Sequence, residues 1–179
     1  FLDVSCNDSL RTLDCSLNQL TSLNVSCNPE LSTLACSENQ LTSLSIGFAP
    51  KLNVLYCPDN PLTQLDVRQC PVLRELDCYD NRLEQLNLRL CNLLKHLDCN
   101  NNREFLDCSD NQLNQLDLSN CRALQHLACS GNQLTHLDAA PCSALRTMTC
   151  NSNSLEQLDV SGCTALESLS LTHNRLTTL

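Results

Sequence analysis

The sequence repeats every 21 residues, and no other feature constrains its fold as strongly. Residues 31–46 give the pattern L-x-x-L-x-C-x-x-N-x-L-x-x-L-x-(V/I/L), and five further residues complete the unit. Asparagine holds the ninth place of every unit, at Asn18, Asn39, Asn60, Asn81, Asn102, Asn111, Asn132, Asn153 and Asn174. One such coil cannot bury its apolar side alone, so coils stack and share a continuous core. The period therefore predicts a solenoid along essentially the whole chain.

Each unit contains two short segments in which apolar and polar residues alternate. Residues 75–78 place Leu76 and Cys78 on one side, a period of two that is typical of a strand. Residues 64–67 alternate in the same way in the second half of a unit. Stacked coils put such strands about 4.8 Å apart in a parallel sheet. The asparagine amide can bond backbone groups at the turn that follows. Because so short a unit leaves little room for a helix, we predict a mainly β fold.

This pattern resembles the 21-residue, cysteine-bearing class of bacterial leucine-rich repeats found in internalin J and related surface proteins. The resemblance covers nearly the full length. It implies a leucine-rich-repeat solenoid, a curved right-handed superhelix of about nine coils with a parallel concave sheet and little or no helix. We therefore treat residues 1–179 as a single domain. Neither end carries a polar cap, so we expect further chain or a partner to cover the ends, or end-to-end self-association.

One unit is too short. The interval from Leu94 to Leu124 is thirty, where two periods need forty-two, so twelve positions are missing. Asn102 is followed at once by Arg103, which takes the opening place of the next unit. The missing stretch is a whole second half, either truly deleted or absent from the sequence. Both interpretations predict an irregular coil or a chain break near residues 100–106, and a true deletion predicts a hole or a rearranged crossing.

The 15 cysteines follow the repeat rather than a disulfide pattern. Eight occupy the sixth place and five the nineteenth, whereas Cys6 and Cys27 lie one residue before the nineteenth. Neighbouring Cβ atoms in an in-register parallel sheet lie at about the strand spacing and point the same way, which strains a disulfide. We predict a ladder of free, buried thiols that pack as small apolar side chains. Metal binding by these thiols is the alternative, although no Cys-x-x-Cys motif is present.

The exposed places of the central coils carry aromatic and charged residues, whereas those of the end coils are small. We predict that these residues form a ligand-binding patch on the concave sheet, because exposed aromatics amid charges carry interface energy. The patch comprises Val54, Tyr56, Glu75, Asp77, Tyr79, His96, Asp98, Phe105, Asp107 and His126. The alternative is chance variation on a solvated surface.

Three carboxylates of the patch, Asp77, Asp98 and Asp107, are expected on neighbouring strands about 4.8 Å apart. A cationic protein surface or a calcium ion would offset their repulsion. A second column, Asp66, Asp117, Asp138 and Asp159, is expected to cap turns on the other side of the solenoid. His96 and His126 lie too far apart to share a metal, and no nucleophile accompanies them. We expect no catalytic residue, no metal and no cofactor, so the chain is not predicted to be an enzyme.

The composition argues against two classes of partner, nucleic acids and membranes. The net charge of −9 argues against nucleic acid, and no apolar run approaches the roughly 20 residues of a membrane span. The resemblance implies a recognition module of a bacterial surface or secreted protein that binds a protein or a glycan. The alternative is the substrate-targeting arm of a larger effector, delivered to the host cytosol, whose catalytic domain lies outside this chain; free thiols suit that compartment. A purely structural or engineered array is the third interpretation.

Overall fold

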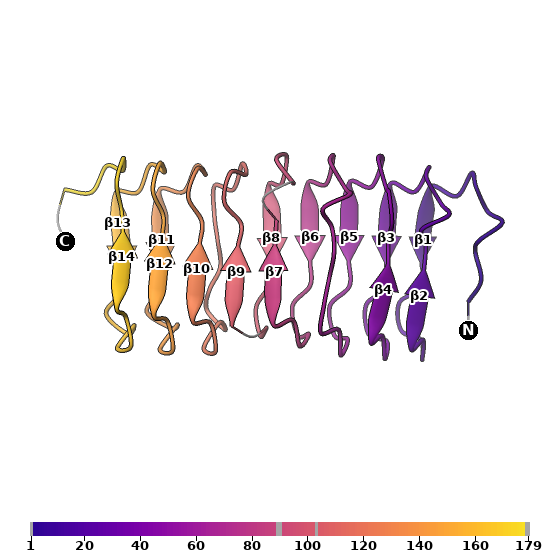
Figure 1. Ribbon diagram of the computed structural model, residues 1–179, viewed down its shortest axis with the longest axis horizontal. Helices are drawn as coiled ribbons and strands as arrows, with labels where there is room; N and C mark the ends of the chain where they lie inside the picture. The colour runs from indigo at the N-terminus through magenta and orange to yellow at the C-terminus, as the bar shows by residue number, and fades with distance from the viewer. Residues whose placement is uncertain (1, 89–90, 103, 178–179) are drawn as a thin grey trace.

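The computed structural model describes residues 2–88, 91–102 and 104–177 (Figure 1). These residues form strands of three residues each and no helix. The strands are β1 (Thr12–Asp14), β2 (Ser22–Asn24), β3 (Thr33–Ala35), β4 (Ser43–Ser45), β5 (Val54–Tyr56), β6 (Glu75–Asp77), β7 (Gln85–Asn87), β8 (His96–Asp98), β9 (Phe105–Asp107), β10 (His126–Ala128), β11 (His136–Asp138), β12 (Thr147–Thr149), β13 (Gln157–Asp159) and β14 (Ser168–Ser170). Fourteen strands at two a turn give about seven turns. The mainly β solenoid is confirmed, but the expected nine coils are too many.

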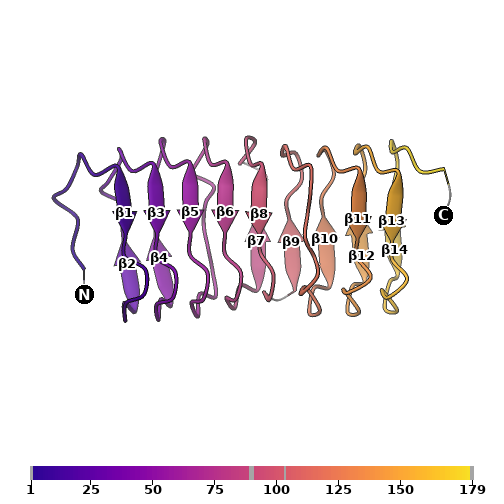
Figure 2. The same cartoon turned by 180° about the vertical axis from the view of Figure 1, so that it is seen from behind.

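The strands follow directly from the alternation in the sequence. In β6 the central Leu76 is fully buried while Glu75 and Asp77 face outward. Every strand pairing is parallel and in register, as in β5–β6, where Val54 lies opposite Glu75. Figures 1 and 2 show the result as two rows of strands, one on each side of the solenoid. Stacked leucines fill the space between the rows, and Leu52, Leu55 and Leu62 are fully buried.

The ninth-place asparagines bond backbone groups at their turns, as predicted, and from Asn39 onward they also tie each turn to the one before it. The Asn81 amide nitrogen lies 3.0 Å from Cys57 O in the preceding turn and 3.1 Å from Cys78 O in its own. Its Oδ1 accepts a hydrogen bond from Leu62 N of the preceding turn at 3.1 Å. Asn81 is 7% exposed, so these bonds lie in the protein interior. The column therefore satisfies backbone groups that the short strands leave unpaired.

At the short unit, each row of strands begins to be built from the other half of the repeat. β7 comes from the second half of its unit and β9 from the first half, yet they pair with Gln85 opposite Phe105 and Asn87 opposite Asp107. On the other side, Asn100 lies beside a second-half segment, because its Oδ1 accepts a hydrogen bond from Asn120 N at 3.2 Å. The missing half-turn thus rotates all later units by half a turn.

Each row therefore changes at the junction from one half of the repeat to the other. Face 1 runs through β1, β3, β5, β6, β8, residues 115–117, β11 and β13. Face 2 runs through β2, β4, residues 64–66, β7, β9, β10, β12 and β14. We expected one sheet to carry all first-half strands, and this is wrong. No second half follows residues 94–102, so the next first-half strand, β9, forms on the opposite face from β8. The described residues on either side of position 103 pair in such a rearranged crossing. A true deletion at this point stays a prediction.

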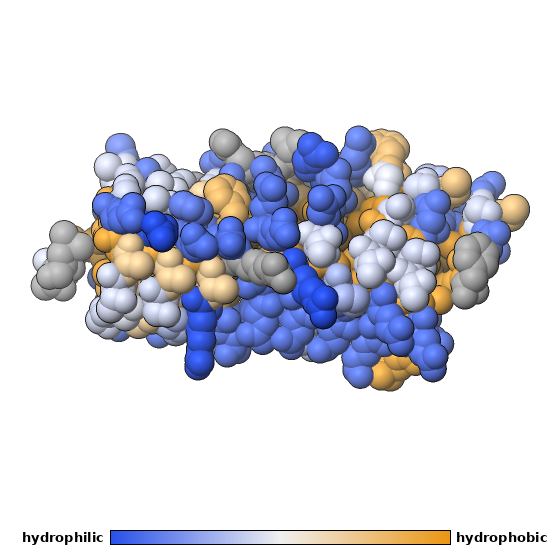
Figure 3. Space-filling model, turned by 60° about the horizontal axis from the view of Figure 1, so that its bottom comes forward, coloured by the Kyte–Doolittle hydropathy of each residue, from blue (hydrophilic) through white to orange (hydrophobic). Residues whose placement is uncertain are grey.

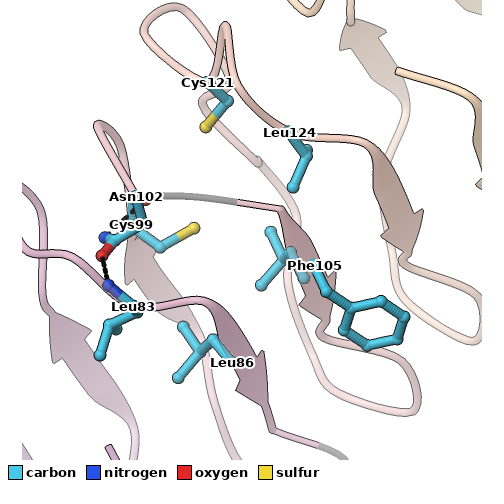
Figure 4. Close-up of a pocket in the computed structure, with 8 residues that line it drawn as sticks. Leu83, Leu86, Cys99, Asn102, Phe105, Cys121 and Leu124 are labelled. Carbon is cyan, nitrogen blue, oxygen red and sulfur yellow. Dashed lines mark hydrogen bonds between the residues drawn. The ribbon is translucent and has the colours of Figure 1, made fainter. Parts of the chain in front are cut away.

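The junction also leaves the predicted hole, but a small one. A cavity of about 20 Å³ lies where the two arrays meet. Figure 4 shows the side chains around it, which include Leu83, Leu86, Cys99, Leu106, Cys121 and Leu124. The volume suffices for one water molecule, but the lining is apolar apart from Asn102 and favours an empty cavity. The half-turn shift therefore leaves only a small cavity at the junction.

Restoring the missing half-turn is expected to reverse the exchange of rows. A copy of residues 61–72 inserted between Asn102 and Arg103 supplies the absent second half. β9 should then pair with β8, and the added leucines should increase the buried surface. The denaturant dependence of unfolding should become steeper because the m-value scales with the surface exposed. An unchanged m-value with a lower midpoint would mean that the insert stays outside the solenoid.

The cysteine ladder is confirmed, with one correction. All fifteen cysteines are free and thirteen are buried, but Cys6 and Cys27 are exposed. In these two units the nineteenth place holds Asn7 and Asn28 instead, and Asn28 is only 2% exposed. Its amide nitrogen donates to Val4 O at 2.9 Å and to Asn7 O at 3.0 Å. Asparagine therefore takes the inward position, and the thiol one residue earlier faces solvent.

Candidate functional site

The structure divides the predicted patch between the two faces. Seven residues belong to Face 1 and the turn that follows β6: Val54, Tyr56, Glu75, Asp77, Tyr79, His96 and Asp98. Phe105, Asp107 and His126 belong to Face 2. Asp107 lies opposite Asn87 rather than beside Asp98, so the expected row of three carboxylates is wrong. The half-turn shift is the physical reason. A binding role for either group stays a prediction.

On Face 1 the predicted residues form a contiguous cluster. Tyr56, Asp77 and Asp98 lie opposite one another on β5, β6 and β8. Tyr56 Oη donates a hydrogen bond to Glu75 Oε2 at 2.8 Å. This bond, with burial and the charges of Glu75 and Asp77, raises the pKa of the Tyr56 hydroxyl. Tyr79, in the turn after β6, also has a raised pKa because of burial and the nearby carboxylate of Asp59. The cluster therefore combines two tyrosines with a strongly negative field.

The half-turn shift extends this cluster into a column that sequence reasoning missed. After Asp77 and Asp98, the same column continues on Face 1 through Asp117, Asp138 and Asp159. Asn100 joins the two halves, since its Nδ2 donates to Asp98 Oδ1 at 2.9 Å and to Asp117 Oδ2 at 3.3 Å. We call these five aspartates the acidic column. The shortened unit was visible in the sequence, but the acidic column forms only if the later units are rotated by half a turn.

Four members of the column also cap turns. Asp98 accepts a hydrogen bond from Asn100 N at 3.1 Å. The other three were predicted to cap turns, although not on the expected side. Asp117, Asp138 and Asp159 each accept a hydrogen bond from the backbone N–H two residues later, at 2.8–3.0 Å. Bonds from Ser119 and Ser161 lower the pKa of Asp117 and of Asp159. Asp66 makes the equivalent bond to Arg68 N and lies on Face 2. A capping role thus accounts for part of the column. Asp77 also accepts a backbone hydrogen bond from Tyr79, but one of its two carboxylate oxygens has no partner among the described residues.

Asp77 keeps its charge at a cost in stability. Its Oδ1 is buried and has no hydrogen-bond partner among the described residues. Burial, followed by repulsion from Asp98, raises the pKa of the Asp77 carboxyl above its ordinary value of 3.8. A group whose pKa is higher in the folded chain destabilises the fold once it ionises, so this penalty is complete above the folded pKa and absent below 3.8. Charges kept against stability in this way are characteristic of functional surfaces.

Neutralising Asp77 is therefore expected to stabilise the fold. Asp77→Asn should raise the unfolding temperature at neutral pH, and the gain should vanish as the pH falls below 3.8. The matched control is Asp117→Asn, which should lower the unfolding temperature at neutral pH because the Asp117 pKa is lowered by folding. Thermal unfolding followed by circular dichroism across pH measures both. A loss of stability in Asp77→Asn at neutral pH would contradict this assignment.

Face 2 carries a smaller aromatic group next to the junction. Phe105 is 40% exposed, and its ring centroid lies 6.2 Å from that of His126 with the planes at 43°. His126 Nδ1 is 2.8 Å from Thr147 Oγ1, a hydrogen bond that orients the imidazole. Asp107 is 8% exposed, and its Oδ1 accepts a hydrogen bond from Ser109 N. This group exposes an aromatic edge but little charge.

Neither face has a large exposed apolar patch in the parts of the chain that are described. The large exposed apolar side chains are scattered, at Leu17, Phe48, Phe105 and Leu169. Figure 3 shows one side of the molecule, where hydrophilic residues cover most of the surface and apolar ones lie in small separate areas. Across residues 2–88, 91–102 and 104–177, no cluster of three or more His, Cys, Asp or Glu is arranged to hold a metal ion. The same residues contain no helix with the length and apolarity to cross a membrane.

Comparison with solved structures identifies the repeat. The structure is similar to the functional domain of InlJ from Listeria monocytogenes, which includes a cysteine ladder, with 33% sequence identity and a TM-score of 0.55. The match covers 100% of this chain and 38% of that one. The chain is a leucine-rich-repeat protein. Its sixth-place thiols form the same kind of ladder that the InlJ domain contains.

A second structure supports the fold of this leucine-rich-repeat protein. A leucine-rich-repeat protein of Leptospira interrogans matches 98% of the chain with 24% identity and a TM-score of 0.51. The match covers 52% of that structure, so the chain spans less than two thirds of either relative. No protein-family model matches the chain, and no curated protein matches it. Stacked repeats of this kind present extended surfaces suited to protein interaction.

Proposed function

We propose that this leucine-rich-repeat chain is the recognition module of a bacterial surface or secreted protein and binds a cationic partner protein through Face 1. The acidic column carries the proposal: five aspartates follow one another at about the strand spacing. Neither outward column of Face 1 contains a lysine or an arginine, since its other members are Thr, Val, Glu, His, Gln, Ala, Tyr and one further Asp. A row of like charges without internal compensation favours a partner with the opposite charge.

The tyrosines supply the anchors that charge alone does not. Tyr56 and Tyr79 are partly exposed at the start of the acidic column, and Tyr56 is held in place by its bond to Glu75. Tyrosine buries a large apolar area at a low cost in side-chain entropy, which makes it a frequent contributor to interface energy. Charge then sets the orientation and the rate of association, while the tyrosines hold the complex together.

Selection of peptides from a displayed library of mixed charge tests the proposal. Binders should be enriched in Lys and Arg and should weaken as salt is added. The variant D98N/D117N/D138N/D159N, which keeps the capping oxygens, should lose about tenfold or more in affinity, equivalent to about 1.4 kcal/mol. The matched control D8N/D66N/E84Q/E104Q removes the same charge away from the acidic column. Equal losses in both variants, or binders without basic residues, would refute a Face 1 site.

A second candidate is the targeting arm of a larger effector that works in the host cytosol. The observation that favours it is the free state of all fifteen cysteines, which suits a reducing compartment. The two candidates share the same binding face and differ in what flanks the chain. Intact mass and peptide mapping of the natural protein separates them, since an effector should carry a catalytic domain and a surface protein an anchor.

A further inference from the structure

Two thiols stand apart from the buried ladder. Cys6 and Cys27 are exposed, whereas the other thirteen cysteines are buried. Both hold the eighteenth place of their units, and Phe48 takes that place in the next unit. The exposed thiols therefore stand in adjacent turns, and Phe48 replaces the cysteine in the turn that follows Cys27.

The two turns that carry them have the same backbone and stack directly. Asn7 N donates to Val4 O at 3.0 Å, and Asn28 N donates to Val25 O at 3.0 Å. The Asn28 side chain joins the turns, with its Nδ2 2.9 Å from Val4 O and 3.0 Å from Asn7 O. Cys6 and Cys27 thus occupy equivalent positions of stacked turns, for which a separation close to the strand spacing of about 4.8 Å is expected.

This spacing suits a bridged pair of thiolates better than a disulfide. A disulfide needs Cβ atoms about 3.5–4.5 Å apart that are turned toward each other. Equivalent side chains of stacked turns are expected to be parallel and about 4.8 Å apart. A bond between a soft metal ion and a thiolate is roughly 2.3 Å long, as for zinc. Two such bonds in line span about 4.6 Å, which matches the distance between equivalent side chains of stacked turns.

The surroundings decide which ion fits. Zinc requires four ligands, and the described residues offer no third His, Cys, Asp or Glu in ligand position beside the pair. Among the described residues, Ser5 contacts the pair, with its Oγ 4.0 Å from Cys6 Sγ. The Asp3 carboxylate is held by Ser5 N at 2.9 Å. A soft monovalent cation that accepts two thiolates and needs no oxygen ligand is therefore the match.

We propose that Cys6 and Cys27 form a surface site for Cu(I), bound in line between the two sulfurs. Binding breaks the two S–H bonds, forms two S–Cu bonds and releases two protons to solvent, with no change in oxidation state. The buried ladder stays outside this chemistry. Burial raises the pKa of Cys36 and of Cys108 to about 12, which keeps these thiols protonated. A hydrogen bond with Cys99 lowers the pKa of Cys121, but that thiol is buried and out of reach of solvent.

Anaerobic titration of the reduced chain with Cu(I), against a chromophoric Cu(I) chelator, tests the site. The native chain should withdraw one equivalent, and C6S, C27S and C6S/C27S should each lose it, because one thiolate cannot bridge. All three variants lie on exposed turns and should unfold at the native temperature. Retention of the equivalent by C6S/C27S would assign the copper to the ladder. Retention by a single variant, or no uptake by the native chain, would also overturn the proposal.

Alkylation provides a second test that needs no variant. A short native treatment with iodoacetamide should modify two thiols, Cys6 and Cys27, and abolish copper uptake, while the remaining thirteen react only after denaturation. Peptide mapping identifies the labelled residues. Rapid labelling of ladder cysteines, or copper uptake that survives labelling of both exposed thiols, would contradict the assignment.

Discussion

Asn81→Ala is expected to lower the free energy of unfolding by about 4 kcal/mol. The substitution leaves Leu62 N without its acceptor and removes the amide that three carbonyl oxygens share, those of Cys57, Cys78 and Tyr79. Asn81 is 7% exposed, so water cannot readily replace these bonds. Each lost bond to a buried group costs about 1 kcal/mol, and the orphaned N–H adds its own desolvation penalty. Urea unfolding measures the loss.

Asn18→Ala is the matched control at the same repeat position. Asn18 is exposed and donates only to carbonyls of its own turn, Cys15 O at 3.1 Å and Ser16 O at 2.9 Å. Its loss should cost about 1 kcal/mol or less, since water can solvate both carbonyls. Equal costs at the two positions would mean that the column acts through local turn geometry alone and not by joining successive turns.

Cys78→Ser is expected to be more damaging than Cys78→Ala, although serine is closer to cysteine in shape. Cys78 is fully buried and burial raises its pKa strongly, so the sulfur acts as a small apolar group. Alanine leaves a small void at a cost of about 1–2 kcal/mol. Serine buries a hydroxyl without a partner and should cost about 3 kcal/mol. Urea unfolding of the two variants measures the difference.

The exposed thiol provides the contrast for this prediction. Cys27→Ser should change the stability by no more than about 0.5 kcal/mol because its side chain faces solvent. If Cys78→Ser were as stable as Cys78→Ala, the thiol would be a hydrogen-bonding group and the ladder a polar network.

Most of the fold follows from local patterning. Alternation around residues such as Leu76 fixes which side chain faces inward, and the ninth-place asparagine marks each turn. Cysteine spacing predicted the ladder, because a 21-residue period repeats the inward position. The burial predicted for Cys6 and Cys27 was wrong, because a shift of one residue reverses the side to which a side chain points.

The candidate site was harder to predict because it depends on the whole chain before it. Asp98 and Asp117 meet only because the absent half-turn rotates every later unit, which also moves Asp107 to the opposite face. The absence of the second half can be read from the sequence, but it is compatible with two arrangements, in which β9 pairs either with β8 or with β7. Strand pairing decides between them, since both halves of the repeat offer the same three-residue strand with a central leucine and can pair with either.

Zero-length cross-linking across the junction tests this half-turn shift most directly. Residues 85 and 105 lie opposite each other in the structure, whereas an unshifted array would place residues 96 and 105 together. A carbodiimide joins a lysine and a carboxylate only in direct contact, so the variants Q85K/F105E and H96K/F105E report the two arrangements. We predict a cross-linked peptide in Q85K/F105E and none joining positions 96 and 105 in H96K/F105E. The reverse result would contradict the exchange of faces and divide the acidic column between them.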